Sequence, residues 1–213
     1  QVALTAPPTA RPDPTPKCAG NRARSARSDT FFGVGLSVFR APVDNDGLKL
    51  LADLGRSVGA GADTLRRWRD LGVDRLPADE LVAHEHTVET FDDGSEIHRH
   101  EVTIPTSLAD LPRLGVTFEL PTGYDRLRWY GRGPLENYPD RNRGAMLGIW
   151  ESPVDDSPYL VPQEFGLRTD CRWFEFVNST TGQTVRLDAL DPIALHVSAT
   201  RFTAHDLYAA GHE

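Results

Sequence analysis

The segment from Trp129 to Arg141, WYGRGPLENYPDR, contains the residue types that a sugar-facing surface uses. Aromatic rings supply a stacking face, and carboxylate, amide and guanidinium groups supply planar hydrogen-bonding partners. The strand-like alternation before the segment ends at Tyr130, and glycine and proline then exclude regular structure, at Gly131, Gly133, Pro134 and Pro139. The polar residues that this rigid loop presents are Glu136, Asn137, Tyr138, Asp140 and Arg141. Sugar contact is one interpretation, and a purely structural loop on a β-domain is the other.

Several carboxylates are candidates by type for glycoside hydrolysis. Hydrolysis with retention needs two carboxyl groups about 5 Å apart, one as acid/base and the other as nucleophile. The candidates are Asp44, Asp46, Glu136, Asp140, Glu151, Asp155, Asp156 and Glu164. The sequence does not show the strand–helix alternation that builds a (β/α)8 barrel.

Two pairs of histidines flank the dipeptide Asp93-Gly94, and their members are His84, His86, His98 and His100. Asp93-Gly94 between two β-like runs predicts a hairpin with a two-residue type I′ turn. This register pairs Glu85 with Val102 and places the two histidine pairs on opposite faces, whereas a three-residue loop would place all four on one face. Ordinary alternating polar positions explain these histidines, and we predict no metal site.

Alternating apolar and polar positions predict β-strands through most of the chain after Pro77. Apolar residues occupy every second position between Arg113 and Leu120, which is typical of a strand with one buried face. The same alternation occurs at residues 185–189 and 193–199. We therefore expect an antiparallel sandwich. Its buried residues should include Leu114, Val116, Phe118, Trp129 and Leu195.

Two short helices should accompany the strands. Apolar residues recur about once per turn from Asp63 to Leu71, and Gly72 follows at the position expected of a C-cap. Thr203 and Asp206 have the spacing of a capping box for a helix that runs to Ala210.

The first thirty residues differ in composition from the rest. Five prolines lie between Pro7 and Pro16, and Arg22, Arg24 and Arg27 follow. Such a polar tract buries too little apolar area to offset the entropy of ordering it. We predict that residues 1–30 form a disordered or artefactual tail. A transit peptide, which is rich in Arg and Ser and poor in acidic residues, is the alternative.

Composition excludes several classes of protein. With 213 residues, 39% of them hydrophobic, the chain can bury a core as one domain. A formal net charge of −8 argues against nucleic-acid or membrane partners. Cys18 and Cys171 are too few for a disulfide framework or a thiolate zinc site. No apolar run reaches the length of a membrane span and no secretory segment begins the chain, so we expect a cytoplasmic protein.

Three segments in order carry a family resemblance: Arg40–Gly47 (RAPVDNDG), Trp129–Arg141, and Pro162–Trp173 (PQEFGLRTDCRW). They are similar to signature motifs of the small-chain domain, the C-terminal β-sandwich, of glycoside hydrolase family 2 β-galactosidases. The resemblance extends from about Phe39 to the end of the chain. Phe165 stands where the family motif has an asparagine, so a polar contact is not expected there.

The resemblance implies a mainly β fold over residues 31–213, an antiparallel β-sandwich of the galactose-mutarotase-like kind, truncated and with short helices. In the family, both catalytic carboxylates lie on a separate (β/α)8 barrel. We therefore assign no catalytic residue to this chain and expect the chain alone to be inactive. We also expect no cofactor in this chain, because any cations used by the intact enzyme should lie outside it.

The resemblance further implies that two loops lie near the sugar or against the barrel. Their residues are Arg40, Asp44, Asn45, Asp46, Gly47, Glu136, Asn137, Tyr138, Asp140 and Arg141. We expect both loops to pack together at one end of the sandwich, with Arg141 bonded to Asp44 or Asp46. An Asx turn formed by Asp44 and Asn45 explains the first loop equally well.

The predicted function is that of a fragment or small subunit of a β-galactosidase, which hydrolyses terminal β-D-galactosides when intact. The expected partners are the barrel portion or large subunit and a galactoside, with an oligomer in the intact enzyme and no nucleic acid or membrane. An autonomous carbohydrate-binding module is one alternative. A mutarotase-like isomerase that uses a histidine and a carboxylate as acid and base is another.

Overall fold

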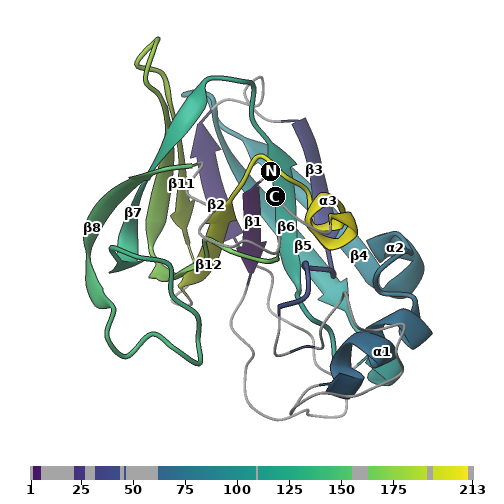
Figure 1. Ribbon diagram of the computed structural model, residues 1–213. Coiled ribbons are helices and arrows are strands. Elements are labelled where there is room, and N and C mark those ends of the chain that lie inside the picture. The colour runs from purple at the N-terminus through teal and green to yellow at the C-terminus, as the bar shows by residue number, and fades with distance from the viewer. Residues whose placement is uncertain are drawn as a thin grey trace.

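Two antiparallel β-sheets form the framework of the molecule (Figure 1). The computed structural model describes residues 2–5, 22–26, 32–43, 46, 62–108, 110–154, 163–190 and 194–210. The five-stranded sheet has the order β3 (Phe32–Ser37), β6 (Gly115–Glu119), β1 (Val2–Thr5), β12 (Leu195–Ala199), β9 (Arg168–Cys171). The seven-stranded sheet has the order β4 (Ala83–Thr90), β5 (Ser95–Thr103), β2 (Arg22–Ala26), β11 (Thr184–Ala189), β10 (Trp173–Asn178), β7 (Tyr124–Gly133), β8 (Met146–Pro153). The predicted mainly β sandwich is confirmed.

The main hydrophobic core contains side chains from both sheets. Phe176 of β10 meets Phe118 of β6 edge-to-face, with ring centroids 6.2 Å apart, and it meets Phe174 in the same way at 5.8 Å. Edge-to-face contacts of this kind add stability beyond the burial of apolar area. The predicted core is confirmed, with Leu114 half-buried and the others buried, namely Val116, Phe118, Trp129 and Leu195.

Strands β1 and β2 lie within the tract that we predicted to be an unstructured tail. β1 pairs with β6 and β12, and β2 pairs with β5 and β11. The structure differs from the prediction at these residues, because backbone pairing on both sides holds strands whose side chains alone would not predict order. The rest of the first thirty residues lies outside the described residues, and the domain boundary at residue 30 stays a prediction.

The turn between β4 and β5 also differs from the prediction. The backbone N–H groups of Phe91 and Gly94 donate to the carbonyls of Ser95 and Phe91, both at 2.9 Å, which closes a three-residue loop. Gly94 has a φ of 77°, as expected for a type I turn followed by a left-handed residue. The predicted type I′ turn needs a left-handed backbone at Asp93 as well, which a residue with a Cβ adopts less readily. The strands are therefore paired one residue away from the predicted register.

The helices lie together beside β3 and β4, far from the β7–β8 ribbon (Figure 1). They are α1 (Ala62–Leu71), α2 (Ala78–Leu81) and α3 (Ala204–Ala209), with a 3-10 turn at Thr106–Leu108. The predicted first helix and its glycine cap are confirmed: Val73 N–H donates to the Trp68 carbonyl at 2.9 Å, and Gly72 N–H donates to the Arg69 carbonyl at 3.1 Å. This pair of bonds is a Schellman motif, and Gly72 supplies its left-handed residue with a φ of 76°.

A second core lies under the helices. It contains Trp68 of α1, Val73 just after that helix, and Val102 of β5. α3 begins with the predicted capping box, in which Asp206 N–H donates to Thr203 Oγ1 at 3.0 Å and Thr203 N–H donates to the Asp206 carboxylate at 2.9 Å. Within the described part of the chain, the helices are too short and too polar to cross a membrane.

Candidate functional site

The three motif segments meet in one region of the fold. Ala41 from the first and Phe165 from the third are buried against each other and against Leu207 of α3. Tyr138 from the second donates its hydroxyl to the Glu164 carbonyl at 3.5 Å. The first and second motifs are thus each joined to the third, and Phe165 makes a hydrophobic contact where the family motif has an amide.

Within the first motif, Arg40 and Asp46 form a bidentate ion pair. Arg40 Nη1 lies 2.6 Å from Asp46 Oδ2, and Nη2 lies 3.0 Å from Oδ1. Asp46 Oδ2 also accepts a hydrogen bond from Val43 N–H at 2.9 Å, and the guanidinium lies 5.1 Å above the Trp68 ring. These contacts close the loop on itself. The motif residues Asp44, Asn45 and Gly47 lie outside the described residues.

Asn137 fastens the second motif to β9. It is 2% exposed, and its amide nitrogen donates to the carbonyls of Arg132 (3.2 Å) and Leu135 (2.9 Å). Its amide oxygen accepts from the N–H of Thr169 at 3.1 Å and from the Thr169 hydroxyl at 2.5 Å. An amide side chain has two donor hydrogens and two acceptor lone pairs, so Asn137 uses its full capacity inside the chain.

Glu136 links the same loop to the third motif. Its carboxylate accepts from Gly166 N–H at 2.7 Å and from Arg141 Nη2 at 2.8 Å. The Arg141 guanidinium also lies 4.5 Å above the Tyr138 ring. Of the two partners predicted for Arg141, Asp46 is bound by Arg40 of its own short loop, and Asp44 lies outside the described residues. Asp140 lies exposed beside this group.

Glu164 forms a buried ion pair with Arg113, and both residues are 7% exposed. The sequence presented Glu164 only as one of several carboxylates that were candidates by type. Arg113 comes from the segment before β6, so this pair joins the third motif to the five-stranded sheet. A buried pair of this kind fixes geometry more than it adds stability, because desolvation offsets most of the Coulomb attraction.

The glycines of the second motif have a role that differs from the prediction. β7 continues through Gly133 instead of ending at Tyr130. A Cβ at Gly133 would lie 2.5 Å from Trp150 Cδ1, and one at Gly131 would lie 2.9 Å from Cys171 Sγ. The glycines therefore admit neighbouring side chains against a regular strand and do not interrupt it.

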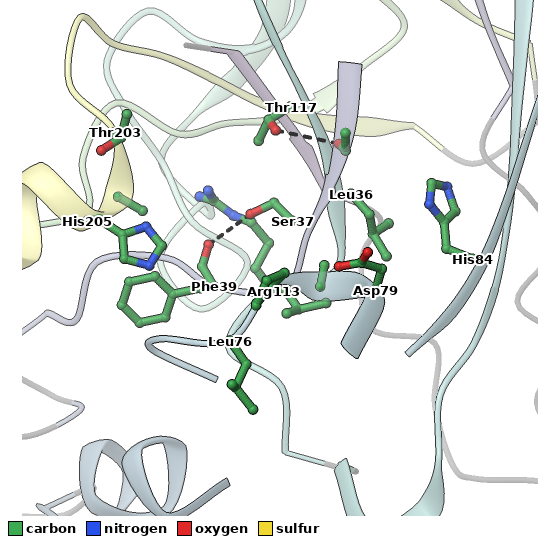
Figure 2. A pocket seen from close by; sticks show the side chains of 15 residues that line it. Leu36, Ser37, Phe39, Leu76, Asp79, His84, Arg113, Thr117, Thr203 and His205 are labelled. Carbon is green, nitrogen blue, oxygen red and sulfur yellow. Dashed lines mark hydrogen bonds between the residues drawn. The ribbon is translucent and has the colours of Figure 1, made fainter. Parts of the chain in front are cut away.

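A pocket of about 530 Å³ lies between β3, α2 and α3 (Figure 2). Arg113 lines it. The rings of Phe39 and His205 lie on one side of the pocket, with centroids 5.0 Å apart, and His84 lies on the other. Among the described residues, the predicted site residues lie outside the pocket lining.

The charged side chains of the motif region are engaged in ion pairs within the chain. Each of the carboxylates Asp46, Glu136 and Glu164 is paired with an arginine. Burial raises the pKa of the Cys171 thiol to about 12, so the sulfur stays protonated and is a poor nucleophile. Tyr138 is half-buried, and Asp140 and Arg141 are exposed.

A sequence model of the family described as "Beta galactosidase small chain" matches residues 21–213. The chain belongs to this family. The match begins before the segment that the sequence motifs covered, and it includes β2.

Curated relatives of this small-chain domain are named β-galactosidases. The chain is 32% identical to that of Yersinia enterocolitica over 164 residues, which cover 74% of the chain and 15% of the relative. It is 30% identical to that of Aeromonas hydrophila over 208 residues, covering 82% and 19%. It is 44% identical to β-galactosidase BgaC of Bifidobacterium adolescentis over 82 residues, covering 38% and 8%. The chain thus spans less than a fifth of the length of these relatives.

Sequence reasoning found the motif residues of the small-chain domain but assigned no role to their partners Arg113, which precedes β6, and Thr169, which lies in β9 within the third motif. Neither spacing nor residue type distinguishes these two residues in the sequence. A buried carboxylate at Glu164 requires a cation nearby, yet the sequence contains many arginines and does not indicate which one approaches.

Proposed function

We propose that this small-chain domain buttresses the catalytic portion of a β-galactosidase and lines one side of its sugar site. Hydrolysis of terminal β-D-galactosides would then belong to the assembled enzyme, as its relatives' names suggest. The observation that carries the proposal is the joining of the three motif segments into one rigid region. A cytoplasmic location and an oligomeric intact enzyme stay predictions within this proposal.

The charge distribution of the motif region supports a docking role. The Glu136 carboxylate is 19% exposed and is held by Gly166 N–H and by Arg141, whose own side chain is 56% exposed. Arg141 thus keeps an accessible guanidinium over the Tyr138 ring. Such an oriented cation on an aromatic face can bind a partner carboxylate or a sugar hydroxyl at little further entropic cost.

Complementation tests the proposal. The catalytic portion of the Aeromonas hydrophila β-galactosidase, expressed without the segment that this chain matches, would be mixed with the 213-residue chain. We expect neither part alone to hydrolyse a chromogenic β-galactoside, and we expect the mixture to do so. The chain alone should be inactive because hydrolysis needs two free carboxyl groups, and Asp46, Glu136 and Glu164 of the motif region are each paired with an arginine.

Arg141→Ala should weaken complementation, and Arg143→Ala is the matched control because it removes the same charge two residues away from an exposed position. Equal activity of the two variants would contradict a docking role for Arg141. Robust hydrolysis by the chain alone would contradict the proposal that hydrolysis belongs to the assembled enzyme.

A further inference from the structure

The observed hairpin register places the four histidines of β4 and β5 on one face of the seven-stranded sheet. Glu85 lies opposite Glu101, and not opposite Val102 as predicted, so His86 lies directly opposite His100. His98 lies two residues before His100 on β5 and therefore points to the same face of the sheet. The predicted register, in which Glu85 paired with Val102, placed the two histidine pairs on opposite faces and therefore gave no reason to expect a cluster.

The four imidazoles form two hydrogen-bonded pairs across the strands. His86 Nε2 lies 3.1 Å from His98 Nδ1, and His84 Nε2 lies 3.0 Å from His100 Nδ1. The rings of His86 and His100 are stacked, with centroids 4.1 Å apart. One ring nitrogen from each of His86, His98 and His100 lies within 4.8 Å of the other two.

We propose that His86, His98 and His100 bind one divalent transition-metal ion of the zinc type, with solvent as a further ligand. Imidazole nitrogen is a preferred ligand for such ions. A tetrahedral site with metal–nitrogen bonds of about 2.0–2.1 Å separates its ligand atoms by about 3.3 Å. The His86 and His98 nitrogens are already 3.1 Å apart, and the third nitrogen, which lies within 4.8 Å of both, can approach this separation by side-chain rotation.

Glu96 and His84, which are not themselves proposed ligands, orient the rings of His98 and His100 through hydrogen bonds. Glu96, which is 5% exposed, has Oε2 at 3.1 Å from His98 Nε2. A carboxylate that accepts the N–H of one ring nitrogen leaves the lone pair of the other, His98 Nδ1, directed at the site. The His84–His100 bond holds the buried His100 ring in a similar way.

The environment of the cluster favours the ligand form of the histidines. Neutral imidazole is the form that binds metals, and each hydrogen-bonded pair contains it, because one ring nitrogen of the pair must accept. β4 is an edge strand of its sheet and His86 is exposed, so an ion can approach from solvent, while His100 closes the inner side.

Titration of the untagged 213-residue chain with Zn²⁺ by calorimetry tests this site. We expect one ion per chain, and we expect His86→Ala and His98→Gln to lose this stoichiometric binding. His205→Ala, which removes an exposed histidine of α3, is the matched control and should bind as the parent does. Far-ultraviolet circular dichroism of each variant checks that folding is unchanged, which is expected because His86 is exposed.

A second measurement addresses geometry. Glu96→Gln keeps the size of the side chain but removes the charge behind His98, and it should weaken Zn²⁺ binding by about 10–100-fold. Bound Zn²⁺ should also raise the unfolding temperature of the parent and not that of His86→Ala. Absence of saturable binding by the parent would overturn the site, as would binding that is unchanged in both His86→Ala and His98→Gln.

Discussion

Asn137 shows how fully one side chain of the signature segment is committed to the fold. Its four hydrogen bonds hold two backbone carbonyls, one backbone N–H and one hydroxyl, all within the chain. A residue type that suggested sugar recognition in the sequence thus organises the loop, while Tyr138 and Arg141 remain nearer to solvent.

Asn137→Ala should lower the free energy of unfolding by about 3 kcal/mol, because buried polar groups would lose their partners. Chemical denaturation of parent and variant measures this difference. Asn142→Ala is the matched control: Asn142 is half-buried and makes one long contact, 3.5 Å to Thr169 Oγ1. A loss for Asn137→Ala no larger than that for Asn142→Ala would show that the hydrogen bonds contribute little.

His196 of β12 should make stability depend on pH. Burial lowers its pKa in the folded state, and Asp170 opposes this shift in part. Below the ordinary value near 6.5, the unfolded chain gains a proton that the folded chain does not, so stability should fall as pH drops through 6.5 towards the folded pKa. The slope for one proton is at most about 1.4 kcal/mol per pH unit.

Denaturation series at several pH values in His196→Gln and in the control His205→Gln measure this contribution. We expect the first variant to have a flatter dependence than the parent and the second to match the parent. Identical slopes in all three proteins would assign the acid sensitivity to other groups.

At the residue scale, the sequence did not determine which side chains contact one another. Arg141 has several carboxylates of equal chemical type to choose from, and its partner Glu136 lies in its own loop. Phe165 makes a hydrophobic contact with Ala41 that the sequence did not predict. Residue type predicts that a buried charge is paired, whereas the partner depends on how the backbones approach.

At the scale of elements, strands β7 and β8 pack closely because the Trp150 side chain of β8 lies over glycines of β7. The Trp150 indole occupies the space where Gly133 would carry a Cβ, and its Nε1 donates to the Gly131 carbonyl at 3.2 Å. Cross-strand contacts of this kind set how closely two strands can lie.

Gly133→Ala should cost about 1–3 kcal/mol through overpacking, because the new methyl group would meet the rigid indole of Trp150. Thermal unfolding and tryptophan fluorescence report the change. Gly144→Ala is the control, since a Cβ there meets nothing within 4 Å, and its effect should stay within about 0.5 kcal/mol. Equal effects of the two substitutions would remove the proposed reason for glycine at position 133.

Elements with strong periodicity were predictable, and those held by pairing alone were not. Alternation predicted the strands around Phe118 and Leu187, and the capping box at Thr203 predicted α3. β2, with the sequence RARSA, has no apolar face to detect and is ordered by its two neighbours. The turn at Gly94 was located correctly, but its length depends on the backbone conformation of Asp93, which the dipeptide does not determine.

At the scale of the whole molecule, the N-terminal strands are internal parts of both sheets. Removal of residues 1–30 would leave β6, β12, β5 and β11 with unpaired edges. We expect the shortened chain to lose cooperative unfolding or to aggregate, because exposed strand edges pair with other chains. Denaturation and light scattering measure this outcome. A shortened chain with an unchanged denaturation midpoint would support the unstructured tail that the composition suggested.

The pairing of β1 with β12 also has a kinetic consequence. Val2 lies opposite Ala199, so completion of the five-stranded sheet joins segments separated by almost the whole chain. Contacts with such large sequence separation slow folding, because the entropy of closing the loop is lost before the contact forms. During synthesis, hairpins such as β4–β5 and β10–β11 can form early, and β1 can pair with β6, but the other edge of β1 stays unpaired until β12 has left the ribosome. This interval is when the nascent domain most needs protection by a chaperone.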